Sequence, residues 1–341
     1  MSFLLCAGRQ HLNKGRVVAH DVDVNLGDHT LEYGDILRDD IVRGRIYGKA
    51  GNPLIVIPGG ISASRFIADG EQTTKKERDG WWSDIVYSGG PVDLNHFQVL
   101  GLDFAPGGDN VNSPLTITTK DQAKRLAKLL DHLNIHHVHA MIGTSYGGMV
   151  CLSFAQEYPE RVGKLCILGA AHRPYAMGVA LRSIQRRIVD MGVDAGRPEQ
   201  GLKLARELAM TTYRSAEEFS ERFTATPHDS NPIRFDVGDY LEARGQHYHT
   251  IMPIHKFKAL SESIDLHAVD PKKITAPSLL IATRSDQLVP PSEMQLMSEL
   301  LTGPSELVTI DSMYGHDSFL KETHILAPLL SSFVQEHRHV A

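Results

Sequence analysis

Cysteine is scarce in this chain of 341 residues: it occurs only at Cys6, Cys151 and Cys166. An odd number of widely spaced cysteines fits neither a disulfide framework nor a zinc ribbon, which favours a reducing compartment. The first ten residues have no basic stretch and too short an apolar run for a secretory signal peptide. We therefore expect a cytoplasmic protein.

An excess of positive charge and long apolar runs are also missing. Lys and Arg number 35 against 41 Asp and Glu, a formal net charge of −6, which leaves no basic footprint for nucleic acid. No stretch approaches the ~18 consecutive apolar residues of a membrane span. The 42% hydrophobic and 22% charged residues are typical of an ordinary globular protein. We expect neither a nucleic-acid nor a membrane partner.

Short apolar runs alternate with helical patterns along most of the chain. The predicted strands cover residues 16–25, 30–37, 41–47, 53–57, 97–104, 140–144, 164–168, 277–283 and 306–310. The predicted helices between and after them cover residues 120–133, 146–158, 291–301 and 324–336. Continuous apolar runs stopped by Pro or Gly are typical of strands that are buried on both faces. The alternation predicts an α/β fold with a mainly parallel central sheet and helices on both faces.

The alternation stops between residues 174 and 268, where helical patterns at 180–189, 201–210 and 217–223 follow one another. A helical insertion in an α/β protein is either a packed extension or a lid over the carboxyl ends of the strands. We predict a core made of residues 1–173 and 269–341, interrupted by a helical lid at 174–268.

The segment Gly143-Thr-Ser145-Tyr-Gly147 lies between a predicted strand and a predicted helix. A Gly-x-Ser-x-Gly turn in that position is the pattern of a nucleophile elbow, which raises a serine hydroxyl above the sheet. The glycines allow a close backbone approach that side chains would block. Ser145 is the predicted nucleophile, and the N–H of Tyr146 is a predicted oxyanion donor.

A serine hydroxyl needs a base that accepts its proton and an acid that orients that base. In α/β hydrolases the acid follows the serine along the chain and the histidine comes last. Asp286 lies just after the strand at 277–283, and His316 lies in the loop between the last strand and the last helix. Either residue alone could be an ordinary loop residue, but their order after these elements predicts a Ser145–His316–Asp286 triad.

The second oxyanion donor should come from the loop after the early buried strand. That loop reads Pro58-Gly-Gly60-Ile-Ser62, and we expect the N–H of Gly60 to be the donor, although Gly-Gly pairs also make plain turns. A cluster of histidines at 132–139 has no accompanying carboxylates or cysteines, so we expect no metal site there.

Several further motifs make the chain resemble the homoserine O-acyltransferases, a family with the α/β-hydrolase fold. The resemblance extends from about Arg43 to Phe333. It rests on Asp79-Gly-Trp-Trp82, the elbow, Tyr158-Pro-Glu-Arg-Val162, Ile184-Gln-Arg186, Leu208-Ala-Met-Thr-Thr-Tyr213, Tyr240-Leu-Glu-Ala-Arg-Gly-Gln246 and Gly315-His-Asp-Ser-Phe-Leu320. The loop after Pro58 and the elbow look more like the shorter, succinyl-transferring branch of the family.

The resemblance implies an acyl transfer to homoserine in methionine biosynthesis, with succinyl- or acetyl-coenzyme A as co-substrate and no metal or other cofactor. It also implies that Ser145, Asp286 and His316 act as the triad. Arg186 and Asp317 would then hold the carboxylate and the amino group of the acceptor, in a homodimer formed through the helical insertion.

Three alternatives stay open at this point. A serine O-acyltransferase would use the same machinery on a shorter acceptor. An esterase would share the same steps up to the acyl-serine, after which water replaces the amino acid. A binding protein with the same fold would have no reason to keep all three residues of a triad, so the sequence argues against it.

Overall fold

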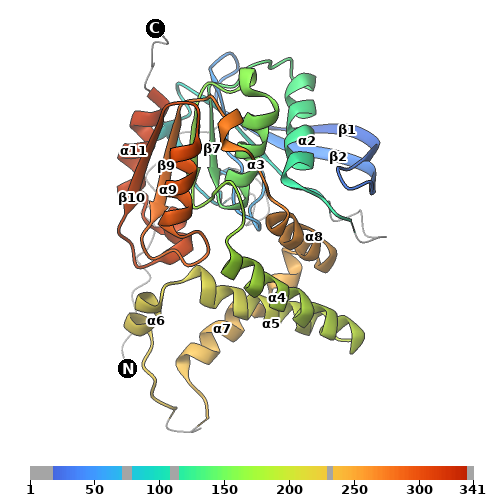
Figure 1. The fold of residues 1–341 in the computed structure, drawn as a ribbon, viewed down its shortest axis with the longest axis vertical. Helices are drawn as coiled ribbons and strands as arrows, with labels where there is room; N and C mark the ends of the chain where they lie inside the picture. The colour runs from blue at the N-terminus through green and yellow to red at the C-terminus, as the bar shows by residue number, and fades with distance from the viewer. Residues whose placement is uncertain (1–17, 71–78, 108–114, 229–232, 336–341) are drawn as a thin grey trace.

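The computed structural model describes residues 18–70, 79–107, 115–228 and 233–335. Figure 1 shows a central sheet with helices on both faces and a separate group of helices, α4 to α8, at one end of it. In the described residues the main sheet has eight strands in the order β1-β2-β6-β3-β7-β8-β9-β10. The pairs from β6 through β10 are parallel, while β1 and β2 pair antiparallel at one edge. The predicted fold class is confirmed.

The strands of this sheet are β1 (Ala19–Thr30), β2 (Ile36–Tyr47), β3 (Leu54–Val56), β6 (Gln98–Leu102), β7 (Ala140–Thr144), β8 (Leu165–Leu168), β9 (Ser278–Thr283) and β10 (Ser305–Ile310). A small second sheet pairs β4 (Val86–Tyr87) with β5 (Val92–Asp93). Every residue of β3, β7, β8 and β9 is buried, as their continuous apolar sequences predict.

The prediction of three short strands before residue 48 is wrong, because the structure has two strands of twelve residues there. Register shifts between Asn25, Gly27 and His29 bend β1 without ending it. A bulge of this kind interrupts the polar–apolar alternation in the sequence, which makes one strand resemble two.

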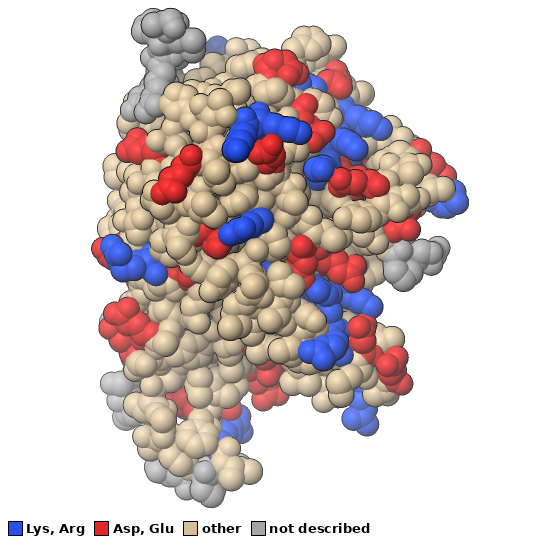
Figure 2. Space-filling view, in the orientation of Figure 1, with Lys and Arg blue, Asp and Glu red and all other residues tan. Residues whose placement is uncertain are grey.

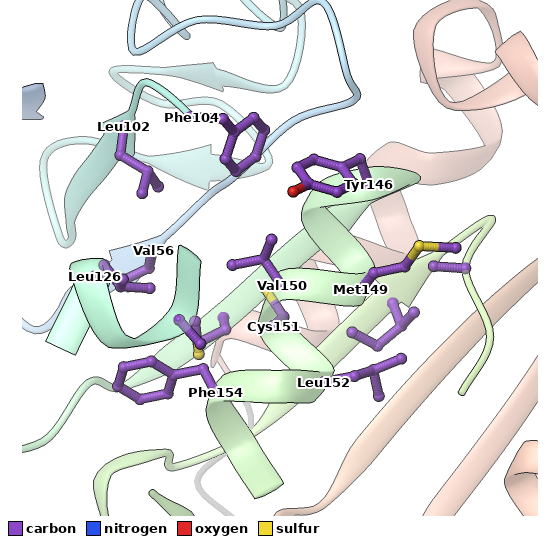
Figure 3. Close-up of a cluster of buried hydrophobic side chains, with 14 of the residues drawn as sticks. Val56, Leu102, Phe104, Leu126, Tyr146, Met149, Val150, Cys151, Leu152 and Phe154 are labelled. Atoms are coloured by element: carbon purple, nitrogen blue, oxygen red, sulfur yellow. The ribbon is translucent and has the colours of Figure 1, made fainter. Parts of the chain in front are cut away.

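The helices of the core are α2 (Thr119–His132), α3 (Tyr146–Glu157), α9 (Pro291–Leu300), α10 (Ser318–Lys321) and α11 (Thr323–Gln335). Thr118 caps α2 in a capping box with Asp121, which satisfies orphan N–H groups at the start of that helix. Figure 3 shows side chains of α3, among them Val150 and Phe154, packed toward Val56, Leu102 and Leu126 in the core. This packing fixes α3, and therefore the turn that precedes it, against the sheet.

The segment between β8 and β9 forms α4 (Ala176–Asp194), α5 (Pro198–Tyr213), α6 (Ala216–Arg222), α7 (Asp236–Gln246) and α8 (Ile254–Asp265). The helices predicted at 180–189, 201–210 and 217–223 lie within α4, within α5 and at α6. In Figure 1, α4 and α5 lie side by side below the sheet, and α8 lies between them and the core. The exact boundaries of the three segments stay a prediction.

The charge distribution on the surface and the character of the helices agree with the charge balance and the short apolar runs of the sequence. Figure 2 shows acidic and basic side chains interspersed on the face drawn, without a continuous basic area. In the described part of the chain, no helix combines the length and the apolar character that crossing a membrane requires. Cys151 and Cys166 are buried free thiols, and Cys6 lies outside the described residues.

Candidate active site

The turn between β7 and α3 holds Ser145 in a backbone conformation that side-chain-bearing residues seldom adopt, with φ 52° and ψ −122°. Two glycines make this turn possible. A Cβ on Gly147 would lie 2.0 Å from the carbonyl oxygen of Pro58, and one on Gly143 would lie 2.5 Å from Cα of Gly148. The glycines of the pattern are therefore required by backbone contacts, as a nucleophile elbow demands.

The three residues predicted as a triad meet in space although they are up to 171 positions apart. Nε2 of His316 lies 2.8 Å from Oγ of Ser145, and Nδ1 of His316 lies 2.7 Å from Oδ2 of Asp286. Asp286 and His316 are 5% and 6% exposed. This is the geometry in which a carboxylate orients an imidazole and the imidazole accepts the proton of a serine hydroxyl.

Backbone groups fix the acid in place. The other carboxylate oxygen of Asp286, Oδ1, accepts hydrogen bonds from the N–H groups of Leu288 and Val289 at 2.8 and 3.0 Å. The turn after β9 therefore leaves Oδ2 directed at His316 alone. Such preorganisation keeps the imidazole in the tautomer that has its lone pair on Nε2.

The same contacts set the pKa of His316. Burial by itself would lower this pKa, because it penalises the charged imidazolium. The charge of Asp286 and its hydrogen bond to the ring outweigh burial, and Asp317 adds to their effect, so the pKa of His316 is raised above its ordinary 6.5. A base with a raised pKa takes a proton from serine more readily.

Two backbone N–H groups lie beside the nucleophile. Tyr146 is the first residue of α3, so its N–H has no acceptor within the helix. The N–H of Gly60 has no hydrogen-bond partner among the described residues, and a Cβ on Gly60 would lie 3.8 Å from Cβ of Ser145. Both residues line the same cavity as Ser145. The loop is held there because the N–H of Gly147 donates to the carbonyl of Gly59 at 2.9 Å.

A cavity of about 250 Å³ opens above the triad. Ser145 and His316 lie in its wall together with Asp317, and residues of α4, α5 and α8 complete the wall from the other side. The helical segment therefore covers the catalytic residues. The helical segment is joined to the core by a hydrogen bond between the hydroxyl groups of Ser263 on α8 and Tyr146, whose oxygen atoms are 2.8 Å apart.

Arg186 and Asp317 are not brought together. The guanidinium of Arg186 binds the carboxylate of Asp265 at 2.7 Å and the hydroxyl of Ser261 at 2.9 Å, and Arg186 is not part of the cavity wall. That Arg186 and Asp317 together hold the acceptor stays a prediction. Asp317 does line the cavity, but the cation beside it is Arg214, with Nη2 of Arg214 3.3 Å from Oδ2 of Asp317.

The pair formed by Arg214 and Asp317 could not be predicted from the sequence, because the end of α5, which Arg214 follows, and the loop after β10 are far apart in the chain. Arg214 is 5% exposed, its Nη1 donates to both carboxylate oxygens of Glu218 at 3.0 and 3.1 Å, and its Nε has no hydrogen-bond partner among the described residues. Arg214 directly follows the motif that ends at Tyr213, so extending that motif by one residue would have included it.

Possible metal ligands lie elsewhere. Among the described residues, His228, Asp236 and Asp239 are close enough to share an ion. Asp239 is, however, already paired with Arg234 at 2.7 Å, and Asp236 is exposed, so a solvated charge cluster explains the group. Of the histidines at 132–139, His139 contacts the backbone carbonyl of Val334. The geometry thus gives no reason to place a metal at either group.

Comparison with known proteins identifies the family. Residues 52–323 match the α/β-hydrolase fold family. A homoserine O-succinyltransferase of Xanthomonas campestris is 37% identical over 292 residues, 85% of this chain and 78% of the relative. A homoserine O-acetyltransferase of Geotalea daltonii is 29% identical over 350 residues, 91% of this chain and 95% of the relative. The chain belongs to the homoserine O-acyltransferase family of α/β hydrolases.

Solved structures share the fold of this homoserine O-acyltransferase family member at lower identity. A homoserine O-acetyltransferase from Bacillus anthracis superposes with a TM-score of 0.82 at 18% identity, covering 94% of this chain and 98% of that one. Esterase E22 superposes with a TM-score of 0.83 at 19% identity, covering 93% of this chain and all of that one. Because transferases and esterases share this architecture, the fold alone does not separate the two activities.

The tryptophan motif that suggested the family builds the wall of the cavity. Trp81 lines the cavity, and a Cβ on Gly59 would lie 2.7 Å from the Trp81 ring, so the oxyanion loop packs directly on this indole. The indole N–H of Trp82 donates to the carbonyl of Phe319 at 2.9 Å. Since Phe319 follows His316 closely, Trp82 holds the loop that carries the catalytic imidazole.

Proposed function

We propose that the chain transfers an acyl group from coenzyme A to the hydroxyl of L-homoserine by way of an acyl-serine. Ser145 attacks the thioester carbonyl while its proton passes to Nε2 of His316. The N–H groups of Gly60 and Tyr146 stabilise the oxyanion. The carbon–sulfur bond then breaks, the proton passes from His316 to the sulfur, and free coenzyme A leaves.

The second half of the reaction uses the same groups in reverse. His316 takes the proton of the homoserine hydroxyl, whose oxygen attacks the acyl carbon. The bond to Oγ of Ser145 breaks, and the proton returns to Ser145. No step requires a metal or another cofactor.

The observation that carries this proposal is a carboxylate and a guanidinium that both line the cavity of the triad, Asp317 next to His316 and Arg206 on α5. An amino acid presents one ammonium and one carboxylate on the same carbon, and a neighbouring carboxylate and guanidinium match both groups. Arg206 can bind the acceptor's carboxylate, because the rings of Tyr213 and Tyr248 hold its guanidinium and no ion pair of Arg206 is found among the described residues. An esterase has no need of such a pair.

The release of free thiol from acyl-coenzyme A, with and without homoserine, tests the proposal. We expect thiol release to depend on homoserine and to be much slower with L-serine, whose hydroxyl is one methylene closer to its charged groups. The variant Arg206→Gln should raise the KM for homoserine while still forming the acyl-serine. Thiol release that is independent of any amino acid, together with ester hydrolysis, would instead establish a hydrolase.

The structural neighbours make an esterase the second candidate, because Ser145, His316 and Asp286 would serve it equally well. The two functions differ in the fate of the acyl-serine. Rapid attack by water regenerates the esterase, whereas the transferase must keep the acyl-serine until homoserine arrives.

The active assembly proposed here is a homodimer formed through α4. Three large apolar side chains at intervals of seven residues, Met177, Ile184 and Met191, are 57%, 41% and 71% exposed. Residues seven apart lie on one face of a helix, and such an apolar stripe is typical of a helix–helix contact.

A further inference from the structure

The segment that joins α5 to α6, Tyr213–Ser215, lies against the loop that carries His316. Gly315, which precedes His316, has φ 57°, and a Cβ on it would lie 2.9 Å from the carbonyl oxygen of Tyr213. The hydroxyl of Ser215 donates to the carbonyl of Met313 in the same loop. The helical segment therefore packs directly on the loop that holds the catalytic imidazole.

The same segment also contacts the turn that carries Asp286. Nε2 of Gln287, the residue after Asp286, donates to the carbonyl of Arg214 at 3.0 Å. Arg214 thus lies where the acid turn and the histidine loop come together, although it is not part of the cavity wall. Any influence of its side chain on a ligand must therefore pass through a residue that does line the cavity.

Asp317 is the cavity residue that the guanidinium of Arg214 contacts. Nη2 of Arg214 lies 3.3 Å from Oδ2 of Asp317, and Asp317 lines the cavity beside His316. Among the described residues, no other basic side chain is within ion-pair distance of Asp317. A carboxylate that is bound on one side by a fixed donor keeps one orientation, which preorganises it for a ligand.

Glu218 on α6 fixes Arg214 and offsets its charge. Nη1 of Arg214 donates to Oε1 and Oε2 of Glu218 at 3.0 and 3.1 Å, and Glu218 is 2% exposed. Arg222 also binds Glu218 at 2.8 Å, but its side chain is 40% exposed and water screens its charge. Because Glu218 offsets the charge of Arg214, the carboxylate of Asp317 keeps a negative charge to offer to a cationic ligand.

We propose that Arg214 is a positioning residue for the acceptor: held by Glu218, it fixes the carboxylate of Asp317 beside the catalytic base, where that carboxylate binds the ammonium group of the amino acid. This inference rests on the proposed function, in which the acceptor is an amino acid. Arg214 does not touch the substrate itself. It acts on the second half of the reaction, because the acylation of Ser145 involves no ammonium group.

Separate measurement of the two half-reactions tests the proposal, with succinyl- or acetyl-coenzyme A, whichever the wild type uses faster. Without homoserine, a burst of free thiol reports the formation of the acyl-serine. With homoserine, the steady-state rate gives the KM of the acceptor. We expect Arg214→Gln to raise the KM for homoserine about 10-fold, the contribution of one charge-assisted contact, and to leave the burst unchanged. Arg214→Lys should restore part of the loss, because the positive charge remains.

Two further variants separate the positioning of Asp317 from support of the fold. Glu218→Gln keeps Arg214 but removes the charge that offsets it, so the KM for homoserine should rise although Glu218 lies outside the cavity wall. Arg222→Gln removes the other arginine that binds the same carboxylate. It is the matched control and should keep the wild-type KM.

An unchanged KM for homoserine in Arg214→Gln would overturn the proposal while leaving the transferase function standing. An equal loss of the burst and of the transfer would overturn it as well, because Arg214 would then support only the fold of the triad. A wild type without homoserine-dependent thiol release would instead contradict the proposed function. Should Arg214→Gln fail to fold by circular dichroism, the double variant Arg214→Gln/Glu218→Gln removes both buried charges and carries the same expectation.

Discussion

At the scale of single residues, catalysis depends on a histidine whose pKa is set by its neighbours. Burial opposes the charged form of His316, and the charge and hydrogen bond of Asp286 reverse that effect. The imidazole must be neutral to accept a proton from Ser145. Activity should therefore rise with pH as His316 loses its proton.

We predict that kcat/KM rises with pH through a single ionisation that lies above pH 6.5, because the pKa of His316 is raised above that value. Steady-state thiol release between pH 5 and 9 measures it. The profile of Asp317→Asn should shift toward lower pH, since Asp317 adds to the rise. A wild-type ionisation below pH 6.5 would contradict the assigned environment of His316.

The site residues that could be predicted from the sequence are those that lie in a recognisable local pattern. Ser145 lies in a turn whose glycines are dictated by backbone contacts within a few residues, and Asp286 and His316 follow recognisable strands. The partnership of Asp317 with Arg214 depends instead on how the helical segment folds back over the sheet. Arg186 was predicted from the resemblance of its motif to the family, and its ion pair with Asp265 was not foreseen. No periodicity in the sequence predicts such a tertiary ion pair.

At the scale of elements, the strand–turn–helix unit of β7 and α3 has the least freedom to change. The strand is fully buried, and α3 is packed on the core along most of its length. The turn between them must also pass the loop that carries Gly60. Hydrogen bonds from Thr144 and Gly147 to the carbonyls of Pro58 and Gly59 join the two loops.

We predict that Gly147→Ala lowers both the activity and the melting temperature. The added Cβ would lie 2.0 Å from the carbonyl oxygen and 2.4 Å from the carbonyl carbon of Pro58, and backbone must shift to admit it. Forcing extra volume into a packed site typically costs about 1–3 kcal/mol. Gly238→Ala on α7 is the control, because nothing lies within 4 Å of its Cβ. Equal melting temperatures for the two variants would argue against this tight contact.

The apolar stripe on α4 makes a second prediction at this scale. Met191→Glu places a charge at a side chain that is 71% exposed, so it should leave the folded protomer intact and weaken association. Sedimentation or light scattering should show that the wild type is a dimer. The variant should be monomeric at protein concentrations at which the wild type is still a dimer. Asp194→Lys at the carboxyl end of α4 controls for a change of surface charge alone. A wild type that is monomeric at all concentrations would contradict the dimer.

At the scale of the whole molecule, the sheet and its helices were predictable because buried parallel strands have continuous apolar sequences. The antiparallel edge of the sheet was not predictable, because the bulges of β1 interrupt the alternation of polar and apolar residues in that strand. The helices α4, α5 and α6 were found from their patterns, but how they cover the cavity is a matter of packing. That cover joins the core through buried polar contacts, among them Nδ1 of His267 with the hydroxyl of Thr119 at 2.8 Å.

We predict that the protein loses stability in mild acid through His267, which is 1% exposed. Burial, which disfavours the charged ring, lowers the pKa of His267 from its ordinary 6.5 to about 3. The unfolded chain therefore binds a proton that the folded one does not, and stability falls as the pH drops from 6.5 toward 3. By pH 5 the loss is about 2 kcal/mol.

Urea unfolding at pH 7.5 and pH 5 measures this loss, and His267→Gln should reduce the difference between the two. Other groups also titrate in this range, so the comparison with the variant is the decisive part. An unchanged difference in His267→Gln would remove His267 as the source.

The most direct measurement for the account is the mass of the intact protein after reaction with acyl-coenzyme A, before and after homoserine is added. We predict that the mass rises by one acyl group on Ser145, persists in water over the time of a turnover, and returns to its original value with homoserine. Ser145→Ala should stay folded and gain no mass. Homoserine-dependent turnover without any acyl-Ser145, or loss of the acyl group equally fast without homoserine, would contradict transfer through this serine.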